Sequence, residues 1–201
     1  MGEPLSEEQV DPDPFRQFDK WLDQAIKAEV PDPNAMVLAT ASAHAVPSAR
    51  VVLLKGVEKG GFTFFTNYRS RKAHDLAENP VAELLFFWSE LARQVRIAGR
   101  VARVSEEESD AYWRLRPRGS QLTAWASPQS EVVPGREVLE RRLQELEKQF
   151  AGKEIPRPPF WGGYRVFPHT FEFWQGRPNR FHDRIRYRRE QEHWIIERLA
   201  P

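Results

Sequence analysis

The chain has 201 residues, of which 40% are hydrophobic, and this length is typical of one compact domain with a substantial core. Thirty Lys and Arg residues against 29 Asp and Glu residues leave a formal net charge of +1, which does not indicate a nucleic-acid or acidic-membrane partner. The absence of Cys excludes disulfides and thiolate chemistry, and five scattered His residues without an HExxH motif predict no metal site.

Residues 1–13 form an acidic, Pro-rich segment that lacks the charged start and apolar run of a signal peptide. No stretch approaches the roughly eighteen consecutive apolar residues that a membrane-spanning helix requires. We therefore expect a mobile acidic leader at 1–13, a single domain at 14–201, a cytoplasmic location and no membrane partner.

A helix and then a series of short strands follow this leader. Asp13 and Pro14 are a typical N-cap and first helical residue, and apolar residues at helical spacing predict a helix that ends near Val30. Aromatic and β-branched runs separated by turn residues predict strands at 35–42, 48–57, 62–67, 81–88 and 92–104. Such closely spaced strands favour a meander or small barrel over alternating βαβ units.

Further helices interrupt and follow these strands. Ser70 can cap a helix over 71–79, and Ser105 with Glu108 predicts a capping box for a helix that Pro117 ends. Apolar residues at helical spacing predict another helix over 135–150. The tail contains strand candidates at 163–167, 170–175, 180–188 and 193–199. The predicted fold class is therefore mainly β with peripheral helices (α+β).

One stretch suited to binding an anion is TNYRSRKAHDL. Arg71 and Lys72 lie in the first turn of the predicted helix, where the helix dipole disfavours cations. Free backbone N–H groups and these two side chains would form a phosphate cradle. An exposed basic turn explains the same pattern equally well.

Two further stretches carry groups that could bind a phosphate. Arg50 and Lys55 bracket an apolar strand, although a Lys at a strand end is usually a surface residue. Tyr112 and Arg116 are four residues apart on a predicted helix, and with Ser120 they could offer a phenol, a guanidinium and a hydroxyl to one phosphate. A Tyr–Arg pair at this spacing is more often a surface packing contact.

The stretch WQGRPNRFHDR, late in the chain, is rich in cations. In an extended strand Arg180, His182 and Arg184 would project from one face. Arg180 and Arg184 would be about 13 Å apart, and their repulsion at an effective dielectric of about 20 is on the order of 1 kcal/mol, so no ligand is required. Asp183 and Glu172 could also neutralise the arginines, which would give a salt-bridged strand.

In their order along the chain these motifs resemble the pyridoxine/pyridoxamine 5′-phosphate oxidase family, from about Phe15 to Pro201. The resemblance rests on PSARVVLLKG, FTNYRSRKAHDLAENP, ARQVRIAGRV, RPRGSQLTAWASPQS, FWGGYRV, FEFWQGRPNRFHDR and the terminal ERLAP. Several ordered motifs are far more specific than any single one. The resemblance implies an FMN-binding split β-barrel that works as a homodimer, with FMN at the subunit interface. It also implies oxidation of pyridoxamine and pyridoxine 5′-phosphate to pyridoxal 5′-phosphate, with O2 as acceptor, giving H2O2, and ammonia from the amine.

The resemblance further implies a set of site residues, some of them from the second subunit. Those expected to bind FMN are Arg50, Val51, Leu53, Lys55, Phe65, Thr66, Arg71, Lys72, Gln94, Gln129, Ser130, Trp174 and Arg184. Those expected to bind the substrate are Lys55, Tyr112, Arg116, Ser120, Arg180 and His182. Arg180 and His182 are expected over the pyridine ring as the catalytic pair.

Other interpretations compete with this one. A different split-barrel flavin oxidoreductase is disfavoured because the Tyr112, Arg116 and Ser120 set occurs together with the Arg180–His182 pair, and these groups serve pyridoxal-type phosphates. A non-catalytic protein that binds FMN or pyridoxal 5′-phosphate would need many of the same residues. A nucleic-acid-binding barrel fits least, because the basic residues form several small clusters and the net charge is near zero.

Overall fold

The computed structural model of the protein describes residues 4–201. Its α-helices are α1 (Pro14–Lys27), α2 (Arg71–Glu78), α3 (Glu106–Leu115), α4 (Arg118–Ala126) and α5 (Arg136–Gln149), with 3-10 turns at Ser89–Leu91 and Pro178–Arg180. Its strands are β1 (Ala35–Ala41), β2 (Pro47–Leu53), β3 (Gly56–Glu58), β4 (Gly61–Asn67), β5 (Val81–Trp88), β6 (Arg93–Arg103), β7 (Trp161–Gln175), β8 (Asp183–Glu190) and β9 (His193–Arg198). The mainly β fold class with peripheral helices is confirmed.

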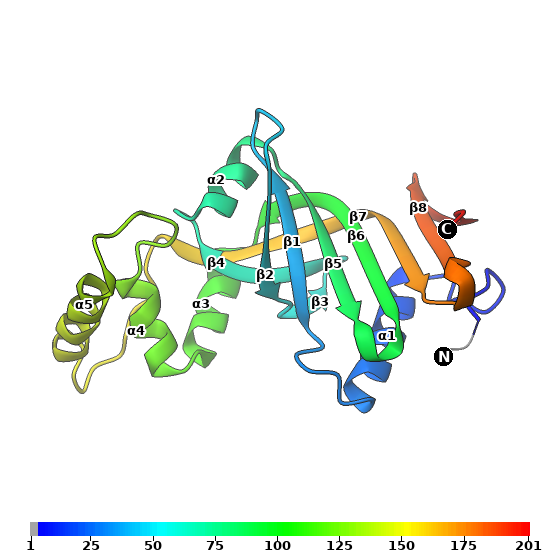
Figure 1. Ribbon diagram of the computed structural model, residues 1–201. Coiled ribbons are helices and arrows are strands. Elements are labelled where there is room, and N and C mark those ends of the chain that lie inside the picture. The colour runs from blue at the N-terminus through cyan, green and yellow to red at the C-terminus, as the bar shows by residue number, and fades with distance from the viewer. Residues whose placement is uncertain (1–3) are drawn as a thin grey trace.

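The strands form one antiparallel sheet organised around β7. The strand order is β2-β1-β5-β6-β7-β4-β3, and β8 and β9 extend from β7. One edge of β7 pairs with β6, whereas its other edge is divided, because residues 161–166 pair with β4 and residues 170–175 pair with β8. This divided edge splits the sheet into two halves, and β7 crosses the molecule between them (Figure 1).

β7 is continuous, although the sequence pattern predicts two strands separated near Pro168. Pro168 has no N–H to donate to a neighbouring strand, and it lies opposite a shift in the register between β6 and β7 at Ala98/Gly99. A Cβ atom at Gly99 would lie 2.2 Å from the carbonyl oxygen of Phe167. Gly99 therefore permits the close approach at this bulge, which lets β7 pass Pro168 without ending.

Helix α1 packs its apolar face against the inside of the sheet. The ring of Phe18 is fully buried and lies 4.9 Å from the ring of Phe62 on β4 and 5.0 Å from that of Phe86 on β5. Trp21 makes an edge contact with Phe173 on β7 at 5.2 Å. These contacts join both halves of the sheet to one helix and form the main core.

A smaller core joins the other helices to the start of β7. Its buried residues are Trp113, Leu122, Ile155 and Trp161, and α5 packs against them through Leu143 and Leu146. Figure 1 shows α3, α4 and α5 at one end of the molecule and β8 with both termini at the other. The two ends of β7 therefore have different surroundings.

The helix signals in the sequence have mixed outcomes. The Asp13 cap and the Ser105–Glu108 capping box are confirmed. Ser70 is the N-cap residue of α2, as predicted, but its side chain makes no capping bond, because its hydroxyl donates to the carbonyl of Asn67 at 2.7 Å and accepts no helix N–H. Helix α4 has no counterpart in the sequence predictions, since it begins after Pro117 without a side-chain cap and carries a Gly in its first turn.

The connection between β7 and β8 differs from its prediction. β8 begins at Asp183, whereas the sequence pattern predicts a strand from Arg180. Asn179 and Arg180 have φ angles of 57° and 61°, in the left-handed region, within the 3-10 turn. Arg180 and His182 therefore lie outside the strand that carries Arg184, and their predicted shared face with Arg184 is wrong.

Residues 5–11 contact β8 and β9. The N–H of Leu5 donates to Asp183 at 3.2 Å, Glu7 pairs with Arg198 at 2.7 Å, and the carbonyl of Asp11 accepts from the Tyr187 hydroxyl at 2.7 Å. The mobile leader and the domain division after residue 13 stay predictions. Residues 1–3 of that leader lie outside the described residues.

Candidate functional site

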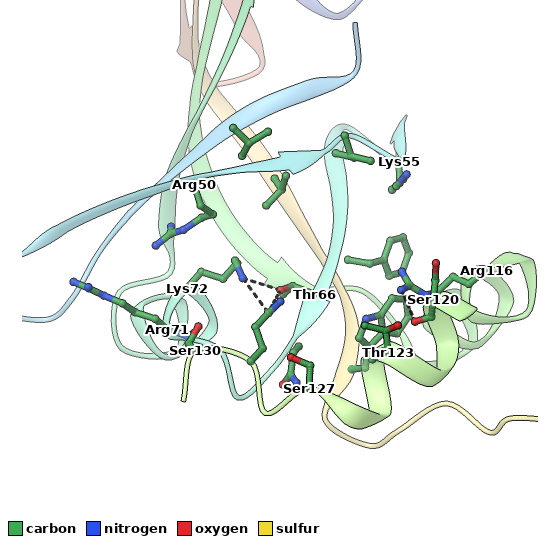
Figure 2. Close-up of a pocket in the computed structure, with 18 of the residues that line it drawn as sticks. Arg50, Lys55, Thr66, Arg71, Lys72, Arg116, Ser120, Thr123, Ser127 and Ser130 are labelled. Atoms are coloured by element: carbon green, nitrogen blue, oxygen red, sulfur yellow. Dashed lines mark hydrogen bonds between the residues drawn. The ribbon is translucent and has the colours of Figure 1, made fainter. Parts of the chain in front are cut away.

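A pocket of about 920 Å³ lies between β2, β4, the start of α2 and helices α3 and α4 (Figure 2). The predicted site residues that line it are Arg50, Val51, Leu53, Lys55, Phe65, Thr66, Arg71, Lys72, Tyr112, Arg116, Ser120, Gln129 and Ser130. Its wall also contains Asn67, Pro117, Thr123, Ser127 and Trp161, to which the sequence pattern assigned no role. The lining includes five cationic side chains from separate parts of the chain, which are Arg50, Lys55, Arg71, Lys72 and Arg116. We therefore call this space the cation pocket.

The ammonium of Lys72 is buried at one end of the cation pocket. Its Nζ donates to Thr66 Oγ1 at 3.1 Å (Figure 2), to Ser70 Oγ at 3.3 Å and to Gln129 Oε1 at 3.2 Å. All three acceptors are neutral. Burial, and then the nearby Arg50, lower the pKa of Lys72 to about 8. A buried ammonium that lacks a carboxylate partner within residues 4–201 favours an anionic ligand.

Arg50 is held beside Lys72 by a network beneath the pocket. Its Nη1 donates to the carbonyl of Leu38 at 3.1 Å and to Thr40 Oγ1 at 2.7 Å, and its Nη2 donates to Ser48 Oγ. Asp75 lies 3.9 Å from the guanidinium and accepts from the Thr40 hydroxyl at 2.6 Å. Burial lowers the pKa of Arg50, and Asp75 opposes that effect. The guanidinium is therefore fixed in direction before any ligand binds.

The N-terminus of α2 completes this end of the pocket. Arg71 is the first residue of α2, and its N–H donates to Ser130 Oγ at 3.2 Å. Ser130 has a φ of 73°, and this bend brings the loop after α4 over the start of α2. Two Arg side chains, a buried Lys and a helix N-terminus therefore lie together at this end of the pocket, and the phosphate cradle stays a prediction.

A second set of polar groups lies at the other end of the cation pocket. The predicted strand 48–57 is divided at Lys55, whose Nζ lies 5.8 Å from the centre of the Tyr112 ring. Arg116 follows α3 directly, and its Nη2 donates to the carbonyl of Ser120 at 3.0 Å. Burial lowers the pKa of Arg116, and Tyr112 opposes that effect.

The Nε atom of Arg116 is buried and has no hydrogen-bond partner in the described chain. Buried N–H groups are nearly always paired, and leaving one unpaired costs roughly 1–3 kcal/mol. The atom belongs to a cation that lines a pocket with Lys55 and the Ser120 hydroxyl. A phosphate oxygen is the acceptor that this donor set fits.

The remaining predicted site residues do not line the cation pocket. They are Gln94, Trp174, Arg180, His182 and Arg184. Gln94 and Arg184 pair with Trp174 from either side in the sheet, and the His182 ring lies 4.6 Å from the Trp174 ring. We call these five residues the β7–β8 group.

The cation pocket and the β7–β8 group lie near opposite ends of β7. Trp161, in the pocket wall, and Trp174 are thirteen residues apart on this strand, which is roughly 40 Å along an extended backbone. Figure 1 shows the same separation, with α3 and α4 at one end of β7 and β8 at the other. The fold therefore does not bring all the predicted site residues together within one chain.

Two members of the β7–β8 group have partners that fix them. Arg184 makes two bonds to Glu172, at 3.0 and 3.1 Å, and donates to the carbonyl of Ala200 at 2.8 Å. The salt-bridged alternative that the sequence left open therefore applies to Arg184. His182 Nδ1 accepts the N–H of Arg177 at 3.1 Å, so a neutral imidazole carries its proton on Nε2.

The sheet face that carries Gln94, Trp174 and Arg184 also carries exposed apolar side chains. Phe87 on β5 is 59% exposed and pairs with Gln94, which pairs with Trp174, so these three side chains share one face. Val51 on the edge strand β2 is 66% exposed and pairs with Val37 of β1. An exposed apolar face of this kind is typical of a protein interface.

The described part of the chain lacks two other kinds of feature. None of its helices is both long and apolar enough to cross a bilayer. No three His, Asp or Glu side chains of residues 4–201 are grouped closely enough to ligate a metal ion.

Together the fold and the pocket define a split-barrel protein with two sets of groups suited to phosphorylated ligands. Residues 22–150 match the family model described as pyridoxamine 5′-phosphate oxidase. Residues 161–201 match the model described as the pyridoxine 5′-phosphate oxidase C-terminal dimerisation region. The chain belongs to the pyridoxamine 5′-phosphate oxidase family of oxidoreductases, and the second match, which spans β7 to β9, supports a homodimer.

Individual proteins resemble this chain over nearly its whole length. It is 60% identical over 198 residues to a pyridoxine/pyridoxamine 5′-phosphate oxidase of Cupriavidus taiwanensis, covering 98% of this chain and 93% of that protein. It is 57% identical over 197 residues to the enzyme of the same name in Acaryochloris marina, covering 98% and 90%.

Solved structures agree with this fold. PhzG of Burkholderia lata 383, in complex with tetrahydrophenazine-1-carboxylic acid, has a TM-score of 0.93 and 33% identity, covering 100% of this chain and 99% of that one. An FMN-binding protein of Nostoc punctiforme related to pyridoxamine 5′-phosphate oxidase has a TM-score of 0.74 and 19% identity, covering 94% and 98%, and supports the fold alone.

Proposed function

We propose that the protein oxidises pyridoxamine 5′-phosphate and pyridoxine 5′-phosphate to pyridoxal 5′-phosphate, with FMN as cofactor and O2 as acceptor. The observation that carries this proposal is the presence of two cations, the buried Lys72 and the half-buried Arg116, at two ends of one pocket and without carboxylate partners in the described chain. Two phosphates would satisfy both, one from the cofactor and one from the substrate. The names of the relatives supply the reaction.

The Lys72 end of the cation pocket fits the FMN phosphate. Arg50, Arg71 and Lys72 would bind it, and Thr66 and Gln129, which Lys72 now contacts, would bind the cofactor beside it. The remaining contacts from this subunit would come from Val51 and Leu53 of β2, from Phe65 and from Ser130. The chemistry that FMN supplies when bound is acceptance of a hydride from the 4′ carbon of the substrate and transfer of two electrons to O2, giving H2O2.

The Arg116 end fits the substrate phosphate. Lys55, Tyr112, Arg116 and Ser120 would hold it, with the unpaired Nε–H of Arg116 donating to a phosphate oxygen. With both phosphates fixed, the protein mainly aligns the 4′ carbon with the cofactor. From the amine substrate, hydrolysis of the oxidised product would release ammonia.

The β7–β8 group would complete the site of the partner subunit. Gln94, Trp174 and Arg184 would contact FMN, and Arg180 and His182 would lie over the pyridine ring. This assignment is supported by the separation along β7, by the exposed apolar face and by the match of residues 161–201 to a dimerisation region. The Nε2–H of His182 could then donate to the substrate, and Arg180 could polarise the 4′ substituent.

A visible spectrum of the purified protein tests the proposal directly. We expect a yellow protein whose flavin absorbance bleaches on anaerobic addition of pyridoxine 5′-phosphate and returns when air is admitted. Pyridoxine without its phosphate is the matched control and should bleach it far more slowly. A colourless protein that FMN cannot reconstitute would show that FMN is not the cofactor. A yellow protein that does not bleach would indicate a protein that binds FMN without oxidising this substrate.

A second candidate is another split-barrel flavin oxidoreductase, which the likeness to PhzG favours. That structure holds a phenazine carboxylic acid, which has no phosphate. The unpaired Nε of Arg116 would suit a carboxylate as well as a phosphate, so the names of the relatives that are 57% and 60% identical are what favour a phosphorylated substrate here. In the same experiment, bleaching by tetrahydrophenazine-1-carboxylic acid and not by pyridoxine 5′-phosphate would select the second candidate.

We expect the affinity of the FMN-free protein for FMN to fall as the pH rises above about 8. The pKa of Lys72 is lowered to about 8 in the absence of ligand, so the ammonium that attracts the phosphate is progressively lost above that pH. The FMN phosphate itself is fully charged there, because its second pKa is about 6. The affinity should fall by up to about tenfold per pH unit, as measured by flavin fluorescence titration between about pH 7 and pH 9.5.

Two substitutions separate Lys72 from other causes of this pH dependence. Lys72→Arg keeps the positive charge at every pH in this range and should flatten the profile. Lys20→Arg changes an exposed residue on α1 and should leave it unchanged. A profile of Lys72→Arg that still falls above pH 8 would exclude Lys72 as its origin.

A further inference from the structure

Trp161 is a buried wall residue of the cation pocket, with 4% of its side chain exposed. Its ring is nearly parallel to those of Phe65 and Tyr112, at interplanar angles of 11° and 8° and centroid distances of 5.4 and 6.2 Å. Trp113 meets it edge-on at 4.9 Å. Trp161 therefore lies within a rigid aromatic group directly under the Arg116 end of the pocket.

The guanidinium of Arg116 lies over this aromatic group. Its central carbon is 4.8 Å from the centre of the Trp161 ring and 5.7 Å from that of Trp113. The one hydrogen bond that the described chain offers this side chain is the bond to the carbonyl of Ser120. Attraction between the cation and the indole face therefore acts together with this one hydrogen bond to set the plane of the guanidinium.

The backbone of Trp161 is tied to the helix that precedes Arg116. Its carbonyl accepts from Arg157 Nη1 at 2.6 Å, and Arg157 Nε in turn donates to Asp110 on α3 at 2.6 Å. The next residue is Gly162, where a Cβ atom would lie 2.1 Å from the Tyr68 hydroxyl oxygen. The start of β7 thus packs closely against its neighbours, and the indole has little freedom to move.

We propose that Trp161 is the residue that positions Arg116 for the substrate phosphate, and that it thereby contributes to the preference for phosphorylated substrates. This inference rests on the proposed function, in which Arg116 binds that phosphate. Trp161 orients the guanidinium through contact with the face of its ring, whereas the reacting 4′ carbon would be bound elsewhere. Its loss should weaken substrate binding and leave the rate of the bound complex nearly unchanged.

The first test compares three variants loaded with FMN. Trp161→Leu should raise KM for pyridoxine 5′-phosphate roughly tenfold with kcat changed less than about threefold. Trp161→Phe keeps an aromatic face and should recover most of the loss. Trp125→Leu is the matched control, because Trp125 bonds to the carbonyl of Pro156 and lies outside the cation pocket. If Trp161→Leu instead loses kcat and bound FMN to the same extent, its role is a general structural one and the proposal is overturned.

A double-mutant cycle with Arg116→Ala gives the decisive readout. If Trp161 acts through Arg116, then adding Trp161→Leu to Arg116→Ala should change KM by less than about twofold. Independent, additive effects of the two substitutions would contradict the proposal. Should Trp161→Leu fail to fold, Trp161→Met, which likewise removes the aromatic face, takes its place in the cycle, with the same expectation of non-additivity.

Failure of the proposed function can be told apart from failure of this inference. If the wild-type protein does not turn over pyridoxine 5′-phosphate, the proposed reaction is wrong. The same cycle is then measured on the dissociation constant of pyridoxal 5′-phosphate, followed by its absorbance. Weaker binding in Trp161→Leu that disappears in the Arg116→Ala background would still support the positioning role, and unchanged binding would overturn it.

Discussion

Replacing Phe87 with Glu is expected to convert the protein into a monomer that no longer retains FMN. Phe87 is 59% exposed on β5 and lies on the apolar sheet face beside Gln94 and Trp174. Burying an unpaired carboxylate in an interface costs several kcal/mol, enough to dissociate a dimer at micromolar concentration. Phe87 does not line the cation pocket, so its own subunit keeps every pocket contact.

The expected loss of FMN follows from the proposed division of the site between subunits. A monomer retains the phosphate cradle around Lys72 and lacks the β7–β8 group that the partner would supply. Light scattering on a sizing column gives the mass, and absorbance of the same peak gives the flavin content. Ile26→Glu is the matched control, since Ile26 is 54% exposed on α1, outside the sheet. A Phe87→Glu dimer that stays yellow would show that this face is not the interface.

Local sequence signals were sufficient to predict most of the helices and strands of this chain. The Ser105–Glu108 capping box starts α3 because both of its hydrogen bonds form within four residues. The pattern of β5, with alternate side chains inside and outside, likewise follows from the period of two. The same signals do not predict features of the structure that depend on contacts between residues far apart in the sequence. β7 passes Pro168 because Gly99, on a strand far back in the sequence, permits the bulge opposite it.

The candidate site was less accessible from sequence patterns than the fold. Arg71 and Lys72 could be singled out because cations are unusual in the first turn of a helix. Trp161 could not, because a Trp before two glycines is typical of a core residue, and its contact with Arg116 depends on the packing of α3 against β7. The left-handed φ of Arg180, which removes it from β8, has no clear local signal either.

The proposed sharing of one site between two subunits leads to the prediction with the largest effect. Arg116→Ala and Arg180→Ala should each lower kcat/KM for pyridoxine 5′-phosphate by roughly 10²–10³-fold, since each removes a charged group from the bound substrate. Arg116→Ala affects the cation pocket, whereas Arg180→Ala affects the β7–β8 group. A dimer made of one subunit of each kind should nevertheless be active.

That mixed dimer contains one site with both residues intact and one site with both replaced, because a two-fold dimer places each pocket against the other subunit's β7–β8 group. Co-expression with two affinity tags allows its isolation, and we expect about half of the wild-type kcat/KM. The reciprocal control joins a wild-type subunit to one that carries both substitutions. Each of its sites then lacks one of the two residues, so this dimer should be nearly inactive. A site formed within one subunit would give the opposite result in both dimers, with the first inactive and the second half active.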